Sequence, residues 1–107
     1  MRLHILTPLA TILDRTDIAN ISARDESGAF GIRPGHAPFM TVLPSSVLTL
    51  RTEHGGVLYA AVAGGTLRVD RDGVWVTSPD AAVGPELAPL AARVAALARL
   101  GLAIDVL

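Results

Sequence analysis

The 107-residue sequence contains no cysteine, which excludes disulfide bonds, thiolate metal sites and thiol nucleophiles. Lysine is absent as well, so all nine basic residues are arginine and a lysine-containing phosphate loop cannot form. Aromatic residues make up only 4% of the chain. The hydrophobic core must therefore be built from Val, Leu, Ile and Ala.

Long apolar runs are also missing. No stretch reaches eighteen apolar residues, so we expect no membrane-spanning helix. The apolar start at residues 3–13 is interrupted by polar residues and proline and has no small-residue cleavage site after it, which favours a pair of strands over a signal peptide. A net charge of -1 argues against a nucleic-acid-binding protein. We expect a soluble cytoplasmic protein, held at a membrane only through a partner.

Alternating apolar and polar residues predict β-strands over much of the first eighty positions. Leu67 and Val69 should point inward from one strand, and residues 57–63 are apolar on both faces, as in a strand buried between two layers. The expected strands cover residues 3–6, 12–15, 18–24, 47–52, 57–63, 66–70 and 74–77.

Glycine and proline punctuate these strands. Asp72-Gly73 indicates a hairpin, and residues 54–56 a second tight connection. Gly64-Gly65 indicates a bend within a strand pair, Pro34-Gly35 a turn, and residues 44–46 a break. Short strands with frequent turns are typical of a sandwich or flattened barrel.

The sequence becomes alanine-rich after Pro79. A single helix is predicted from Glu86 to Leu100, with Pro85 or Pro89 in its first turn and Gly101 at its end. The apolar stripe of this helix consists of Leu87, Leu90, Val94 and Leu97.

Residue patterns for catalysis and metal binding are weak. His4, His36 and His54 are far apart in the sequence, and residues 70–73 begin like a calcium loop that lacks its final carboxylate at Ala81. No Gly-x-Ser-x-Gly motif is present. We expect no catalytic residue, no metal and no cofactor.

Residues 28–40 are unusually rich in glycine and proline, which predicts a stiff, shaped loop. Its side chains either pack in the core or form a preorganised contact surface, since rigid presentation lowers the ordering cost of binding. The apolar and histidine side chains that it carries are Phe30, Ile32, His36, Phe39 and Met40.

Residues 28–38 resemble the signature of F-type ATP synthase epsilon subunits, and residues 63–69 resemble a second motif of that family. The resemblance covers residues 1–84 and implies a mainly β protein, a sandwich of about ten strands. The single short C-terminal α-helix and tail would form a second region, residues 85–107. The expected structural turn residues are Gly31, Pro34, Gly35, Pro38, Gly64 and Gly65.

The resemblance implies a non-catalytic subunit of the central stalk that couples the gamma subunit to the membrane rotor ring during rotary ATP synthesis. It would be peripheral, at the cytoplasmic face of the inner membrane, and would bind no nucleic acid. Many relatives have a carboxylate where this chain has Ala29, and Glu26 is the nearest substitute. The residues matched to the gamma contact are His36, Ala37 and Met40. Those matched to the ring contact are Ser27, Gly28, Ala29 and Phe30.

The C-terminal region departs from the family, whose members usually continue into a pair of helices that can inhibit ATP hydrolysis. Here one helix fits, and an Ile/Leu-Asp-x-x-Arg-Ala motif used by some relatives to bind ATP is missing. A natural short form, a truncated chain and a member of the alternate synthase branch all remain open, as does proton or sodium coupling. The alternative functions are a free-standing β-sandwich that binds another protein and a small cupin-like metal enzyme.

Overall fold

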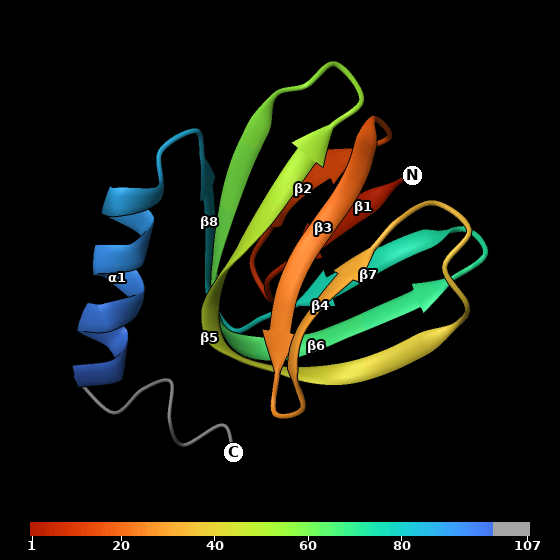
Figure 1. Ribbon diagram of the computed structural model, residues 1–107. Coiled ribbons are helices and arrows are strands. Elements are labelled where there is room, and N and C mark those ends of the chain that lie inside the picture. Colours follow the sequence, from red (N-terminus) through yellow and green to blue (C-terminus); the bar gives the residue numbers. More distant parts are fainter. Residues whose placement is uncertain (100–107) are drawn as a thin grey trace.

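The computed structural model describes residues 1–99, and the surroundings of side chains through residue 96. These residues form eight β-strands followed by one α-helix (Figure 1). In chain order the elements are β1 (Leu3–Leu6), β2 (Thr11–Arg15), β3 (Ile18–Asp25), β4 (Gly28–Ile32), β5 (Phe39–Thr52), β6 (Val57–Asp70), β7 (Gly73–Thr77), β8 (Ala81–Gly84) and α1 (Leu87–Arg99).

Two long strands, β5 and β6, bend in the middle and run through both layers of a sandwich (Figure 1). Residues 39–43 of β5 pair with residues 65–69 of β6, and residues 45–51 pair with residues 57–63. One layer has the order β4-β3-β5-β6-β8 and is called the helix-side layer, because α1 contacts its β5, β6 and β8. The other has the order β2-β1-β7-β6-β5 and is called the open layer.

The number of strands agrees with the expected sandwich once these bends are considered. Six strands belong to one layer each, and the two bent strands contribute one half to each layer. Each layer therefore has five strand segments, and the two layers together have the expected ten. All pairs are antiparallel except β1 with β7, which run parallel.

The bend of β6 lies at Gly64-Gly65, as predicted. Gly65 has a φ of 130°, and a Cβ atom there would lie 2.0 Å from the carbonyl oxygen of Thr77. In β5 the bend lies at Pro44, between the paired residues Leu43 and Ser45. The predicted break at residues 44–46 is wrong, because β5 continues through them; proline is tolerated since the bend leaves it outside the ladder.

The core lies between the two layers. The inward orientation predicted for Leu67 and Val69 is confirmed, because these side chains are at most 5% exposed. Leu48 and Leu50 of β5 and Val74 and Val76 of β7 are buried in the same core. Residues 60–63 of β6 are buried consecutively, because the core covers one face of this strand and α1 covers the other.

The helix α1 begins at Leu87, one residue after its predicted start, and Pro89 lies in its first turn. Within the predicted apolar stripe, Leu90 is buried against the helix-side layer, whereas Leu87 is 47% exposed and does not pack there. The predicted helix end at Leu100 and Gly101 lies outside the described residues. Among the described residues, no helix has the length and apolar character needed to cross a membrane.

Candidate partner-binding face

The glycine- and proline-rich segment at residues 28–40 is not one loop. Residues 28–32 form β4, residues 33–38 form a loop, and β5 begins at Phe39. Within the loop, Pro34 and Gly35 form the predicted turn, in which the His36 amide donates a hydrogen bond to the Arg33 carbonyl (3.1 Å). The expectation of a single loop is wrong. The high glycine content of residues 28–32 was taken as a sign of a loop, but these residues form a short edge strand.

Gly31, predicted as a turn residue, lies within strand β4 and not at a turn or bend. It pairs with Ser22 of β3, and its φ is not positive. Pro38 ends the loop directly before β5, and Gly64 has a φ of 73° at the bend of β6.

The three residues matched to a gamma contact lie at or just after the loop. His36 and Ala37 are exposed, and Met40 is 64% exposed on β5. The His36 ring is tilted against the Phe39 ring with the centroids 5.7 Å apart, and its Nδ1 is 2.7 Å from the Ala37 carbonyl oxygen. These contacts hold the histidine close to the start of β5.

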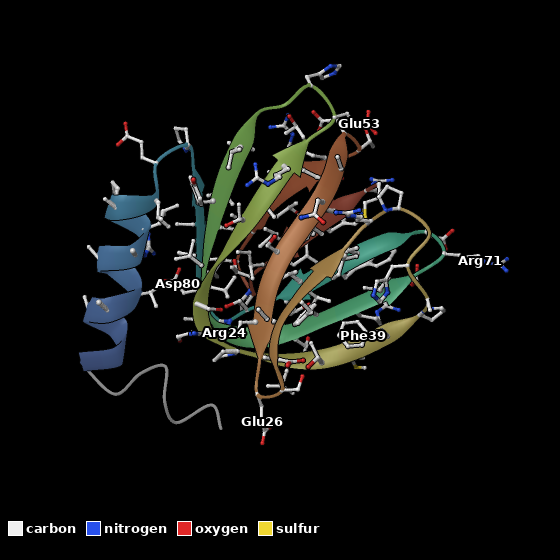
Figure 2. All side chains as sticks on the ribbon, in the orientation of Figure 1. Arg24, Glu26, Phe39, Glu53, Arg71 and Asp80 are labelled. Atoms are coloured by element: carbon white, nitrogen blue, oxygen red, sulfur yellow. The ribbon has the colours of Figure 1, made fainter. Side chains whose placement is uncertain are left out.

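The residues matched to a ring contact lie on the hairpin that joins β3 and β4. Ser27 is in the two-residue turn, next to Glu26 at its tip (Figure 2), and Gly28 and Ala29 open β4. Phe30 is only partly exposed and packs edge-on against Phe39, and both rings lie against the core, so Phe30 serves the core as well as the hairpin.

A row of side chains crosses all five strands on the outer face of the open layer. Strand register places Met40 beside Arg68, Arg68 beside Trp75, Trp75 beside His4, and His4 beside Asp14. The Arg68 guanidinium lies 4.8 Å from the Trp75 ring centroid, which is a cation–π distance. On the other side of Trp75 in the row, the His4 ring is stacked on the indole, with the ring centroids 5.0 Å apart.

Apolar surface continues beside this row. Val42 is 53% exposed, and Leu9, in the turn between β1 and β2, is 97% exposed. A shallow apolar hollow lies between them and is lined by Leu6, Pro8, Gly65, Thr66, Thr77 and Pro79. Within residues 1–99 no helix covers this face, whereas α1 covers the outer face of the other layer.

Three aspartates outside this apolar surface have depressed pKa values. Hydrogen bonds from Arg2 lower the pKa of the Asp14 carboxyl at the end of the row, and hydrogen bonds from Arg15 lower the pKa of Asp17. The pKa of Asp25 is lowered by hydrogen bonds from Ser27 and Thr41.

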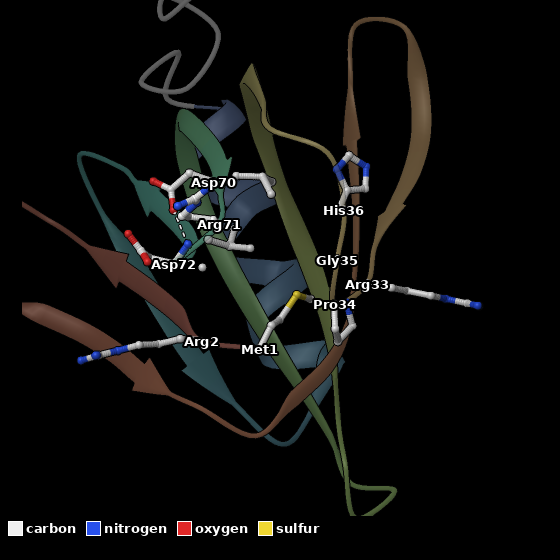
Figure 3. A pocket seen from close by; sticks show the side chains of 12 residues that line it. Met1, Arg2, Arg33, Pro34, Gly35, His36, Asp70, Arg71 and Asp72 are labelled. Carbon is white, nitrogen blue, oxygen red and sulfur yellow. Dashed lines mark hydrogen bonds between the residues drawn. The ribbon is translucent and has the colours of Figure 1, made fainter.

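Figure 3 shows a small cavity of about 150 Å³ between the loop at residues 33–38 and the β6–β7 hairpin. Arg2 and Arg33 extend away from it in opposite directions, so these charges do not converge on one bound group. The three histidines lie in β1, in this loop and in the β5–β6 turn, and the part of the chain that is described contains no group of three metal-ligating side chains.

A family model describing the ATP synthase delta/epsilon chain, β-sandwich domain, matches residues 1–84. The chain belongs to this family. It is 39% identical over 93 residues to ATP synthase epsilon chain 2 of Cereibacter sphaeroides, which covers 86% of this chain and 64% of that protein. It is 38% identical over 95 residues to epsilon chain 2 of Paraburkholderia xenovorans, covering 88% and 68%. The chain thus spans about two thirds of the length of these epsilon chains.

Solved structures share the fold of this delta/epsilon family member. A chain in the cryo-EM structure of the Euglena gracilis mitochondrial ATP synthase OSCP/F1/c-ring matches with a TM-score of 0.72 at 24% identity, over 92% of this chain and 62% of that one. A chain in the Tetrahymena thermophila mitochondrial ATP synthase central stalk/c-ring matches with a TM-score of 0.61 at 20% identity, over 75% and 63%.

Sequence reasoning proposed contacts at residues 27–30 and at His36, Ala37 and Met40, but missed the row centred on Trp75. Alternation alone placed Trp75 on the face opposite Val74 and Val76. Its neighbours in the row, His4 and Arg68, depend on the pairing of three strands, of which β1 and β7 are far apart in the sequence.

Proposed function

We propose that this chain is the non-catalytic epsilon-type subunit of the central stalk of an F-type ATP synthase. It connects the gamma subunit to the membrane rotor ring, so that torque passes between them during rotary ATP synthesis. Its role is mechanical and needs no cofactor, and it is peripheral to the cytoplasmic face of the inner membrane through the complex. Membership of the delta/epsilon family supports this function.

The observation that carries the proposal is the uncovered outer face of the open layer. Met40 and Val42 are large apolar side chains exposed by more than half, next to the Trp75 stack. Exposed apolar and aromatic side chains that gather on one face are typical of protein–protein contacts. We assign this face, with His36 and Ala37 beside it, to the gamma subunit.

The ring contact is assigned to the tip of the β3–β4 hairpin. Ser27, Gly28 and Ala29 lie there, and the tip points away from the loop that carries His36 (Figure 2). Ala29 offers no charge, so Glu26 supplies the carboxylate at the tip. Two distinct contact surfaces on one rigid sandwich are what a coupling subunit requires.

Binding of the 107-residue chain to the gamma subunit of the same organism tests the proposal. We expect the wild-type chain to co-elute with gamma, and Met40→Glu to abolish co-elution because it places an unpaired charge in an apolar contact. Thr66→Glu repeats the test on the same face, at the residue that is paired with Val42. The matched control is Arg51→Glu, an exposed residue on the helix-side layer, which should bind normally.

Wild-type chain that does not bind gamma would contradict this function and favour a free-standing module with another partner. Loss of the β-sheet circular dichroism signal in Met40→Glu would show instead that Met40 supports the fold. Elemental analysis of the purified chain addresses the cupin-like alternative, for which we expect no stoichiometric transition metal.

A further inference from the structure

The tip of the β3–β4 hairpin extends beyond the sheet that anchors it. The last residue of β3 that pairs with β5 is Ser22, opposite Thr49. Farther along, β5 turns at Pro44 into the open layer, so residues 23–25 pair with β4 alone. The turn at residues 26–27 therefore has no main-chain partner on the β5 side.

One carboxylate bridges this gap. Asp25 Oδ1 accepts hydrogen bonds from the Ser27 amide (2.9 Å) and the Ser27 hydroxyl (2.6 Å), and its Oδ2 accepts one from the Thr41 hydroxyl (2.7 Å). The first two bonds fix the turn, and the third joins it to the open-layer half of β5. Ionised carboxylates accept only, so both oxygens are suited to these three donors.

Thr41 is the residue after Met40, so this bond ends beside the side chain assigned to the gamma contact. A surface groove is lined by residues from both sides of the bond, including Glu26, Ser27, Met40 and Val42. The tip and the outer face of β5 thus lie on the two sides of one groove, with Asp25 between them.

We propose that Asp25 is a positioning residue that holds the ring-contact turn in a fixed place relative to the gamma-contact strand. This inference rests on the proposed function. Aromatic packing of Phe30 against Phe39, with centroids 5.5 Å apart, is a second tie between the hairpin and β5. It lies along β4, whereas the polar bridge reaches the turn itself.

Hydrogen exchange in the isolated chain tests the bridge without any partner. In Thr41→Val, which is nearly isosteric and keeps the bonds from Ser27 to Asp25, we expect the Ser27 and Gly28 amides to exchange about tenfold faster. Asp25→Ala should have at least the same effect. Unchanged exchange in both variants would overturn the bridge, whatever the chain binds.

Binding measurements test its consequence. Affinity for detergent-solubilised rotor ring and affinity for gamma subunit are measured separately, each with the partner immobilised. Asp25→Ala and Thr41→Val should each lower ring affinity about tenfold and leave gamma affinity unchanged. The double variant should lose no more ring affinity than the single variant with the larger loss, because both substitutions remove the same bridge. The matched control is Asp70→Ala, since Asp70 accepts the same type of bond from the Asp72 amide (2.7 Å) in the β6–β7 turn; its ring affinity should stay at the wild-type value.

The outcomes separate the two proposals. A wild-type chain that binds neither gamma nor ring contradicts the proposed function. A chain that binds both, with a ring affinity that is insensitive to Asp25 and Thr41, supports the function and overturns the positioning role. Equal loss of ring affinity in Asp70→Ala would also overturn it, because any loosened hairpin would then suffice.

Discussion

The imidazole of His4 lies parallel to the indole of Trp75, with the ring planes 10° apart and the centroids 5.0 Å apart. The two residues are directly opposite each other in the parallel pair of β1 and β7. The Arg68 guanidinium flanks the indole from the next strand. Three strands thus contribute to one stack of partly buried side chains on this face.

Trp75 is the central residue of this group, so we expect Trp75→Ala to weaken gamma binding about thirtyfold, as for an aromatic anchor at an interface. Trp75→Phe should lose less, because it keeps a ring for stacking. Isothermal titration with purified gamma measures both. Thermal unfolding of each variant is the control: full affinity with a lowered melting temperature would make the stack a feature of the fold only.

Gly65 and Gly55 both have positive φ but differ in space. A Cβ at Gly65 would meet the Thr77 carbonyl oxygen at 2.0 Å, whereas one at Gly55 would meet nothing within 4 Å. We expect Gly65→Ala to lower the free energy of unfolding by about 3 kcal/mol or more, and Gly55→Ala by about 1 kcal/mol. Urea unfolding compares them, and equal losses would mean that β6 and β7 separate easily at the bend.

Apolar packing should hold α1 against the sandwich more strongly than its ion pair does. Leu90 is 9% exposed, whereas the Arg93 guanidinium and the Asp80 carboxylate, 2.8 Å apart, are each about half exposed. Leu90→Ala should cost about 2 kcal/mol of unfolding free energy, and Arg93→Ala less than about 1 kcal/mol. Chemical denaturation measures both losses, and a larger effect of Arg93→Ala would reverse this ranking.

Stability should fall in acid. Asp14 and Asp17 have lowered pKa values in the folded chain because of hydrogen bonds from Arg2 and Arg15. A depressed pKa stabilises the fold above the unfolded value, near 4, and this contribution is lost as the pH falls through the folded value. We expect unfolding free energy to be flat from pH 7 to about 5 and to decline below about 4. Asp17→Asn should decline less steeply over the same acid range.

The sequence predicted the elements whose signals are local. The hairpin at Asp72-Gly73 and the alternation in residues 66–70 needed only neighbouring residues, and both are present. Residues 28–40 misled because glycine and proline were taken as evidence against a strand, although β4 is an edge strand that tolerates them. The Asp25–Thr41 bridge depends on the bend of β5 at Pro44, where the sequence indicated a break and not a bend within one strand.

The sharing of β5 and β6 between the layers also determines how the chain must fold. Their hairpin closes through a loop of residues 53–56, so its contacts are local and carry little loop-closure entropy. The β1–β7 pair joins segments near opposite ends of the described chain and forms at a greater entropic cost. Because each half of the hairpin is the template for a different layer, neither layer can melt while the other persists. Denaturant should therefore give one transition, seen equally by Trp75 fluorescence in the open layer and by the circular dichroism of α1 on the opposite side.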